Sequence, residues 1–205
     1  MMTLHWSPRS PYVRKVMIAA HEMGLSDQLN CIRTVVGGTA PHVELMQENP
    51  LGKIPTLVLQ DGTIFYDSPV VCEYLDSLHS GPKLFPTLGP DRFTALRRQA
   101  LGSGMIDMGL LLLGERARPE EGRSQPHMDL WTLKLQTSVS ALEKEADALA
   151  ATPFTIGHVA IGVALGYLDF RFEQLQWREG HSRLAAWYVA FRERPSVQAN
   201  LPAEG

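Results

Sequence analysis

The stretch Ser7-Pro8-Arg9-Ser10-Pro11-Tyr12-Val13-Arg14-Lys15-Val16 follows a short apolar–polar run and opens a helical pattern. Ser10 is a favourable helix N-cap, because a serine hydroxyl accepts a hydrogen bond from an N–H group of the first turn. Pro11 then takes the first helical position, where its missing N–H group is no loss. A hydroxyl at the positive end of a helix also suits an anion. The stretch therefore predicts a strand-to-helix turn, with either a plain cap or an anion site at Ser10.

The residues around this stretch indicate a strand–helix–strand unit. Residues 2–6 can form a short strand, and apolar residues follow helical spacing from Pro11 until Gly24 ends the helix. Residues 29–36 indicate a second strand, closed by Gly37-Gly38. A unit of this size, about thirty residues, is typical of a crossover between two parallel strands.

A hairpin and another helix follow. Asp61-Gly62 stands between two β-rich runs, residues 56–60 and 63–66, which is a strong hairpin signal. Asp67-Ser68-Pro69 then starts a helical pattern. The order βαβ and then ββα predicts a small mixed sheet with helices on its faces.

The composition changes after residue 79. Gly and Pro crowd residues 80–90, which is typical of a linker. Beyond the linker there is no convincing strand, and helical patterns run over 91–117, 128–151, 155–176 and 181–194. We therefore expect an α/β domain over 1–79 and an all-helical domain over 91–205.

The composition and net charge of the chain argue against several classes of function. Of 205 residues, 44% are hydrophobic and the net charge is −3, so nucleic acid and anionic membranes are not expected partners. No apolar run approaches the roughly 18 residues of a membrane span, and no signal peptide is seen. The seven histidines offer no close pair with metal-ligand spacing, so no metal is expected. Only Cys31 and Cys72 are present, which suits a reducing compartment and predicts a cytoplasmic protein.

Ser10 occupies the position at which a redox domain of this layout would carry a reactive thiol. Because residue 10 is Ser and residue 13 is Val, the turn cannot run dithiol exchange. Its hydroxyl can still donate to a thiolate that a ligand supplies. A free thiol has a pKa of ~8.5, and one charge-assisted hydrogen bond at a helix end could lower it by about one or two units. The ligand sulfur would then be the nucleophile. Ser7, on the same loop, is the second candidate for this role.

The stretch Asn49-Pro50-Leu51-Gly52-Lys53-Ile54-Pro55-Thr56 is a candidate site for a peptide-like ligand. A proline at the start of a strand is tolerated and can be cis. With a cis-Pro55, the Ile54 N–H and C=O could pair with the ligand as one more strand. Lys53 could meet a carboxylate. The alternative is an ordinary edge strand with a solvated lysine.

Asp67 and Ser68 repeat the arrangement at Ser10. Ser68 would cap the next helix, with Pro69 in its first turn. A ligand carboxylate could accept from Ser68 at the helix end, and Asp67 could pair with an ammonium. The pair suits a small zwitterion, and a plain cap is again the alternative.

A further helix start, Thr155, is expected to be structural. Thr155 is a plausible N-cap, and Phe154 and Val159 are placed to form a hydrophobic staple. The capping-box position three residues later holds His158 instead of Glu or Gln, so the box is imperfect.

Together, Ser-Pro-Tyr-Val-Arg-Lys-Val, Asn-Pro-Leu-Gly-Lys-Ile-Pro-Thr-Leu and Asp-Ser resemble the cytosolic glutathione transferase family, and most of all its small bacterial members with a Ser-Pro-Phe/Tyr-Val-Arg-Lys first turn. The resemblance implies a thioredoxin-like domain followed by a helical bundle domain. It also implies roles for residues of the three motifs: Ser10 for the glutathione sulfur, Ile54 beside cis-Pro55 for the cysteinyl backbone, Asp67 and Ser68 for the γ-glutamyl end, and Lys53 for the glycyl end. His42, which lies outside the three motifs, is a weaker candidate for the glycyl end.

The implied activity is attack of the glutathione thiolate on a small apolar electrophile held between the domains, where residues 105–110 are a candidate wall or simply core. The family also implies a homodimer. A non-catalytic or weakly active glutathione-binding or regulatory protein is the alternative, whereas Ser10 argues against a thiol reductase. Two residues depart from the family: Asp67 stands where Glu is common, and His158 where Asp is usual. We therefore expect the helix start at Thr155 to be less stable or to rely on another partner.

Overall fold

The computed structural model describes residues 1–37 and 40–204. Gly38, expected at the end of the second strand, lies outside the described residues. The contacts divide the chain into two compact units, one of residues 1–88 with 195–204 and one of residues 89–194.

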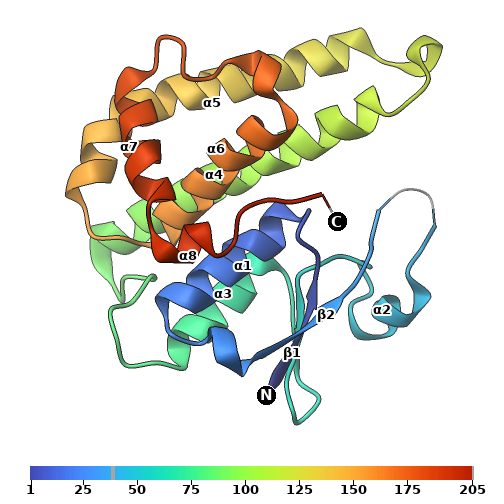
Figure 1. Ribbon diagram of the computed structural model, residues 1–205, viewed down its shortest axis with the longest axis vertical. Coiled ribbons are helices and arrows are strands. Elements are labelled where there is room, and N and C mark those ends of the chain that lie inside the picture. Colours follow the sequence, from blue (N-terminus) through green and yellow to red (C-terminus); the bar gives the residue numbers. More distant parts are fainter. Residues whose placement is uncertain (38–39, 205) are drawn as a thin grey trace. The chain divides into compact units, whose positions relative to one another are not determined.

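The first unit contains a four-stranded mixed sheet with the order β2-β1-β3-β4 (Figure 1). Strand β1 (Met2–Trp6) pairs in parallel with β2 (Leu29–Arg33) and antiparallel with β3 (Thr56–Val58). The hairpin predicted around Asp61-Gly62 joins β3 to β4 (Ile64–Phe65). The predicted mixed sheet is therefore confirmed.

Helices cover both faces of this sheet. In Figure 1, α1 (Pro11–Glu22) and α3 (Ser68–Ser77) lie together on one side of the strands, and α2 (Val43–Glu48) lies on the other. A short 3-10 helix, Ser26–Gln28, leads into β2. This is the thioredoxin-like order expected from the sequence.

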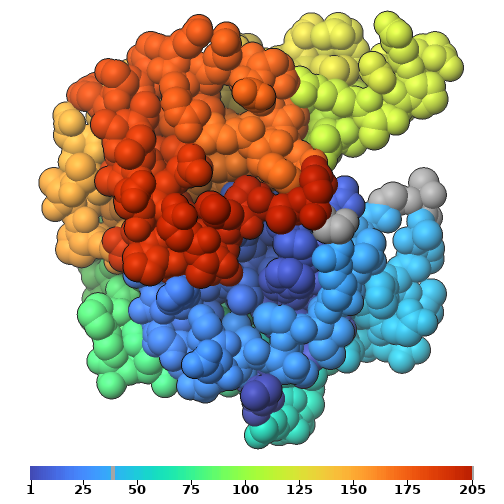
Figure 2. Space-filling view, viewed as in Figure 1, coloured from blue at the N-terminus to red at the C-terminus, as the bar shows by residue number. Residues whose placement is uncertain are grey.

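The C-terminal residues belong to this first unit. Helix α8 (Pro195–Gln198) packs on α1, where the buried Ser196 hydroxyl donates to the Glu22 carboxylate. Figure 2 shows the deep red C-terminal residues beside the blue N-terminal ones, and Glu204 Oε2 lies 3.6 Å from Arg9 Nε. The sequence-based division, which assigned all of 91–205 to the helical domain, differs here because these contacts join residues far apart in the chain.

The second unit is helical, as predicted. Its elements are α4 (Gly89–Arg116), α5 (Gln125–Ala151), α6 (Ile156–Arg171) and α7 (Ser182–Arg192), with two 3-10 helices, Glu120–Gly122 and Glu173–Leu175. Within residues 1–37 and 40–204, no helix combines the length and the apolarity that a membrane crossing requires.

Helix α6 forms the core of the second unit. Every residue from 156 to 168 is buried, and α6 packs along α4. The two backbones approach closely at Gly102, where an added Cβ would lie 2.5 Å from the carbonyl carbon of Ala160. A side chain at residue 102 would therefore push the two helices apart.

Candidate functional site

Ser10 caps α1, as predicted. Its backbone is extended (φ −82°, ψ 118°), and its Oγ accepts a hydrogen bond of 3.2 Å from the N–H group of Val13. Accepting this bond uses a lone pair and leaves the hydroxyl hydrogen to be donated. The 12-residue α1 directs its positive end toward this position. Ser10 can therefore act as a cap and as a donor to an anion at once.

Ser7 is less suited to the same task. It is buried, its Oγ lies 3.4 Å from the N–H group of Arg9, and its carbonyl accepts a 3.2 Å hydrogen bond from the N–H group of Ser10. Ser7 thus shapes the turn before the helix begins, and it lacks a place in the first turn of the helix.

The loop that ends at Pro55 lies against the start of α1. The Ile54–Pro55 peptide bond is cis. The Ile54 side chain is buried in one cluster with Val13 of α1 and Leu45 of α2. Because Val13 is the residue whose N–H group binds Ser10, this packing brings Ile54 and the Ser10 turn into one neighbourhood.

Two buried side chains at the ends of this loop, Asn49 before it and Thr56 at the start of β3, were missed as functional candidates from the sequence. Asn49 donates from Nδ2 to the Lys53 carbonyl (3.0 Å) and to Thr56 Oγ1 (2.9 Å), and its Oδ1 accepts from the N–H group of Leu51 (3.0 Å). Thr56 Oγ1 donates to the same Lys53 carbonyl at 2.8 Å. The sequence pattern assigned roles in this stretch only to Lys53, Ile54 and Pro55, although Asn side chains commonly organise turns in this way.

Of the two candidate cations, Lys53 is the more available. Its side chain is exposed, and within the described part of the chain its ammonium has no ion-pair partner. His42 instead caps α2, since its Nδ1 accepts a 3.2 Å hydrogen bond from the N–H group of Leu45 and lies 3.4 Å from Glu44 Oε2. His42 therefore has a structural role at the start of α2.

The start of α3 differs from the prediction by one residue. The N-cap is Asp67, not Ser68, because the Asp67 backbone is extended and its carbonyl already accepts from the N–H group of Val71 (3.0 Å). The Asp67 carboxylate is exposed and makes no capping bond. Ser68 is only 1% exposed, and its Oγ has no hydrogen-bond partner among residues 1–37 and 40–204. A buried hydroxyl without a partner at a helix N-terminus is a group that a ligand can satisfy.

The chain's own thiols are poor nucleophiles. Cys31 and Cys72 are both free. Complete burial raises the pKa of Cys72 to about 12, and partial burial also raises the pKa of Cys31. The reactive form of a thiol is its thiolate. A thiolate at this site at neutral pH must therefore come with a ligand. The described residues hold no group of three or more side chains suited to a metal ion.

The start of α6 is a complete capping box, contrary to the expectation from His158. The Nδ1 of His158 accepts from the N–H group of Thr155 (3.0 Å), and its Nε2 donates to the Leu149 carbonyl (3.1 Å). Desolvation by burial lowers the pKa of His158 to about 4, so the imidazole is neutral at pH 7. A neutral imidazole nitrogen thus replaces the expected carboxylate oxygen.

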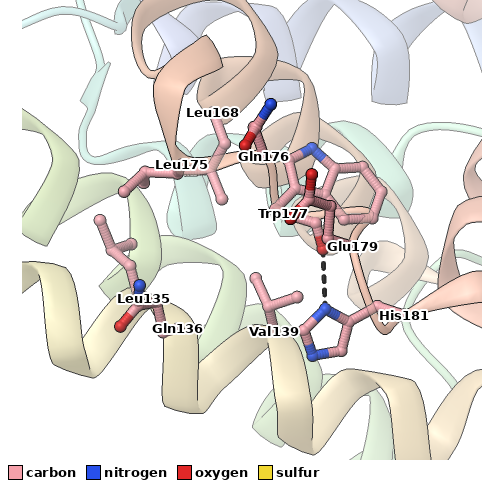
Figure 3. Close-up of a pocket in the computed structure, with 9 residues that line it drawn as sticks. All are labelled: Leu135, Gln136, Val139, Leu168, Leu175, Gln176, Trp177, Glu179 and His181. Carbon is pink, nitrogen blue, oxygen red and sulfur yellow. Dashed lines mark hydrogen bonds between the residues drawn. The ribbon is translucent and has the colours of Figure 1, made fainter.

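The helical unit has a cavity of about 260 Å³ (Figure 3). The residues that line it are Leu135, Gln136, Val139, Leu168, Leu175, Gln176, Trp177, Glu179 and His181. Two of its polar side chains are already paired: His181 Nδ1 donates to the Trp177 carbonyl (2.8 Å), His181 Nε2 accepts from Ser140 (3.0 Å), and the Trp177 indole donates to Asp169 (2.7 Å). These pairs hold the helical unit together, whereas the buried Ser68 hydroxyl of the first unit has no partner among residues 1–37 and 40–204, and we therefore place the candidate site in the first unit.

Comparison with known families gives matches in both units. The family model described as glutathione S-transferase, N-terminal domain, matches residues 9–78. The model described as glutathione S-transferase, C-terminal domain, matches residues 125–190.

Similar proteins are found across the whole chain. A glutathione transferase family member from Pseudomonas fluorescens Pf-5, solved with bound glutathione, is 40% identical, with a TM-score of 0.96 and 100% of both chains covered. A glutathione S-transferase from Methylobacillus flagellatus KT, also solved with glutathione, is 30% identical, with a TM-score of 0.89 and coverage of 99% and 100%. The uncharacterized GST-like protein YibF of Escherichia coli K12 is 31% identical over 174 residues, 83% of each chain.

Proposed function

This chain belongs to the glutathione S-transferase family and is a GST-like enzyme, and we propose that it activates glutathione at Ser10 for attack on a small apolar electrophile. The observation that carries the proposed binding of glutathione is Ser68, whose buried hydroxyl lacks a partner among the described residues at the start of the 10-residue α3. Glutathione is bound in two of the solved relatives, which supports the same ligand here.

Each part of glutathione has a chemically matched group in the first unit. The γ-glutamyl carboxylate accepts from Ser68 at the positive end of α3, while the γ-glutamyl ammonium pairs with the exposed Asp67 carboxylate. The cysteinyl backbone pairs with the N–H and C=O of Ile54 beside cis-Pro55. The exposed Lys53 ammonium forms an ion pair with the glycyl carboxylate. These four assignments account for both charged ends and the middle of the tripeptide.

The glutathione sulfur accepts a hydrogen bond from the Ser10 hydroxyl. This role is supported by the cap geometry, because Ser10 Oγ uses only a lone pair to accept from the N–H group of Val13 and still has its hydrogen to donate. The thiol proton leaves to solvent, and the thiolate is stabilised by the charge-assisted bond and the positive end of α1. With a halogenated nitroaromatic compound, the C–S bond would form as the carbon–halogen bond breaks and halide leaves. Ser10 would be unchanged at the end of the cycle.

We further propose a cytoplasmic homodimer. The two free cysteines suit a reducing compartment. Several large apolar side chains are exposed on α4 and α5, among them Phe93, Leu111 and Leu133, and they are candidates for burial against a second copy. Light scattering on the purified protein should give twice the mass of one chain; a monomer would contradict the homodimer alone.

The proposed function is tested by titration calorimetry with glutathione and by a conjugation assay with a halogenated nitroaromatic substrate. Saturable binding and glutathione-dependent release of halide are expected. Binding without turnover across several electrophiles would favour a non-catalytic glutathione-binding or regulatory protein. Absence of binding would contradict the proposed function itself.

A further inference from the structure

The carbonyl of Lys53 is held by two buried donors. Asn49 Nδ2 reaches it at 3.0 Å and Thr56 Oγ1 at 2.8 Å, and the two donors are themselves joined by a 2.9 Å hydrogen bond. Asn49 is 1% exposed and Thr56 is fully buried. A carbonyl with both lone pairs occupied by buried groups has little freedom to rotate. The orientation of the Lys53–Ile54 peptide plane is therefore fixed from one side.

This fixed plane determines where the next N–H group points. The peptide bond between Lys53 and Ile54 is trans, so its C=O and N–H groups point in opposite directions. Because the Lys53 carbonyl faces Asn49 and Thr56, the Ile54 N–H faces away from them. The buried Ile54 side chain, packed with Val13 and Leu45, holds the same residue by a second contact.

We propose that Asn49 and Thr56 act as a clamp that orients the Ile54 N–H toward the cysteinyl backbone of glutathione. The inference rests on the proposed function and adds two positioning residues to it. Neither side chain needs to touch the ligand. The clamp prepares the backbone donor before binding, so that less conformational freedom is lost when glutathione binds.

A positioning role of this kind predicts a particular kinetic pattern. Because the Ile54 N–H binds glutathione equally in the ground state and in the transition state, loosening it should raise KM for glutathione and leave kcat nearly unchanged. The expected size is that of about one buried hydrogen bond, roughly fivefold to tenfold in affinity.

The experiment compares Thr56→Val with Thr56→Ser in the full-length protein. Valine keeps the shape but removes the hydroxyl that donates to Lys53, whereas serine keeps the hydroxyl. Glutathione Kd by calorimetry and KM should rise roughly fivefold to tenfold in Thr56→Val and stay within about twofold of the wild type in Thr56→Ser. Thr3→Val, the same change on the paired strand β1, is the matched control and should leave Kd unchanged.

A second variant covers the case in which Thr56→Val does not fold. Asn49→Asp keeps an oxygen for the N–H group of Leu51 but loses both donors of Nδ2, and it should weaken glutathione binding at least as much. Wild-type affinity in a folded Thr56→Val or Asn49→Asp protein, or an equal loss in Thr56→Ser, would overturn the clamp. A wild-type protein that does not bind glutathione would instead overturn the proposed function, and the clamp with it.

Discussion

The starts of α1 and α6 use the same capping chemistry in different surroundings. At α6, the N-cap Thr155 is followed three residues later by His158, which completes the capping box. His158 is buried, and both of its ring nitrogens are hydrogen-bonded. At α1, the residue three positions after Ser10 is Val13, which cannot complete a capping box. The Thr155 hydroxyl lies 2.9 Å from His158 Nδ1, which can accept its hydrogen, whereas the apolar Val13 side chain offers the Ser10 hydroxyl no acceptor. The Ser10 hydroxyl can therefore donate its hydrogen to a ligand beside the positive end of α1.

The largest effect expected from this contrast is on stability at α6. His158→Ala would leave the Thr155 N–H and the Leu149 carbonyl buried without partners, at a cost of about 3 kcal/mol in the free energy of unfolding. Urea denaturation measures this loss. The same change at the exposed His127 should cost less than about 0.5 kcal/mol. Equal, small losses in the two variants would contradict the box.

Acid should weaken the same helix start by up to a similar amount. The pKa of His158 is lowered from 6.5 to about 4 in the folded protein, so the unfolded chain binds the proton more tightly. This contribution is full above pH 6.5, falls as the pH drops toward 4, and is lost below 4, a change of about 3 kcal/mol. Denaturation curves of the wild type and His158→Ala over this range measure it as their difference. A constant difference would contradict the buried neutral imidazole.

At α1 the expected effect is on catalysis instead of folding. Ser10→Ala removes the donor to the sulfur and should lower kcat/KM for conjugation roughly thirtyfold, or about 2 kcal/mol, while the lost cap costs about 1 kcal/mol of stability. Steady-state kinetics and calorimetry separate the two effects. Glutathione affinity should stay within about threefold. If Ser7→Ala shows the loss and Ser10→Ala does not, the sulfur belongs to Ser7.

The smallest effect is expected at the start of α3. Ser68→Ala removes a hydroxyl that has no partner among the described residues, so the free energy of unfolding should not fall. Glutathione binding should weaken roughly tenfold, about 1.4 kcal/mol, because the γ-glutamyl carboxylate loses a donor. Ser77→Ala, on the exposed far end of α3, is the control and should leave Kd unchanged. Unaltered Kd in both variants would exclude Ser68 from the site.

The sequence predicts the order of strands and helices well because that order depends on local signals. Ser10-Pro11 marks a helix start, and Asp61-Gly62 marks a hairpin, whatever the rest of the chain does. Local signals could not predict that α8 packs with the first unit. This packing depends on the contact of Ser196 with Glu22, residues separated by most of the chain.

The candidate site was predicted less completely than the fold. The cap at Ser10 and the cis-Pro55 are as predicted, but the N-cap of α3 is Asp67 and not Ser68. His158 was misjudged because a neutral ring nitrogen can accept an N–H bond as a carboxylate does, which the residue type alone does not reveal. The role of a given serine also depends on whether its hydroxyl already has a hydrogen-bond partner, and only the folded structure shows that.

The most direct test of the role proposed for Ser10 is the pKa of the glutathione thiol in the complex, which is measured from the ultraviolet absorbance of the thiolate as the pH is raised. A hydrogen bond from Ser10 and the positive end of α1 predict a value about one to two units below the ~8.5 of a free thiol, and a return toward that value in Ser10→Ala. A pKa in the wild-type complex equal to that of free glutathione would contradict the role proposed for Ser10.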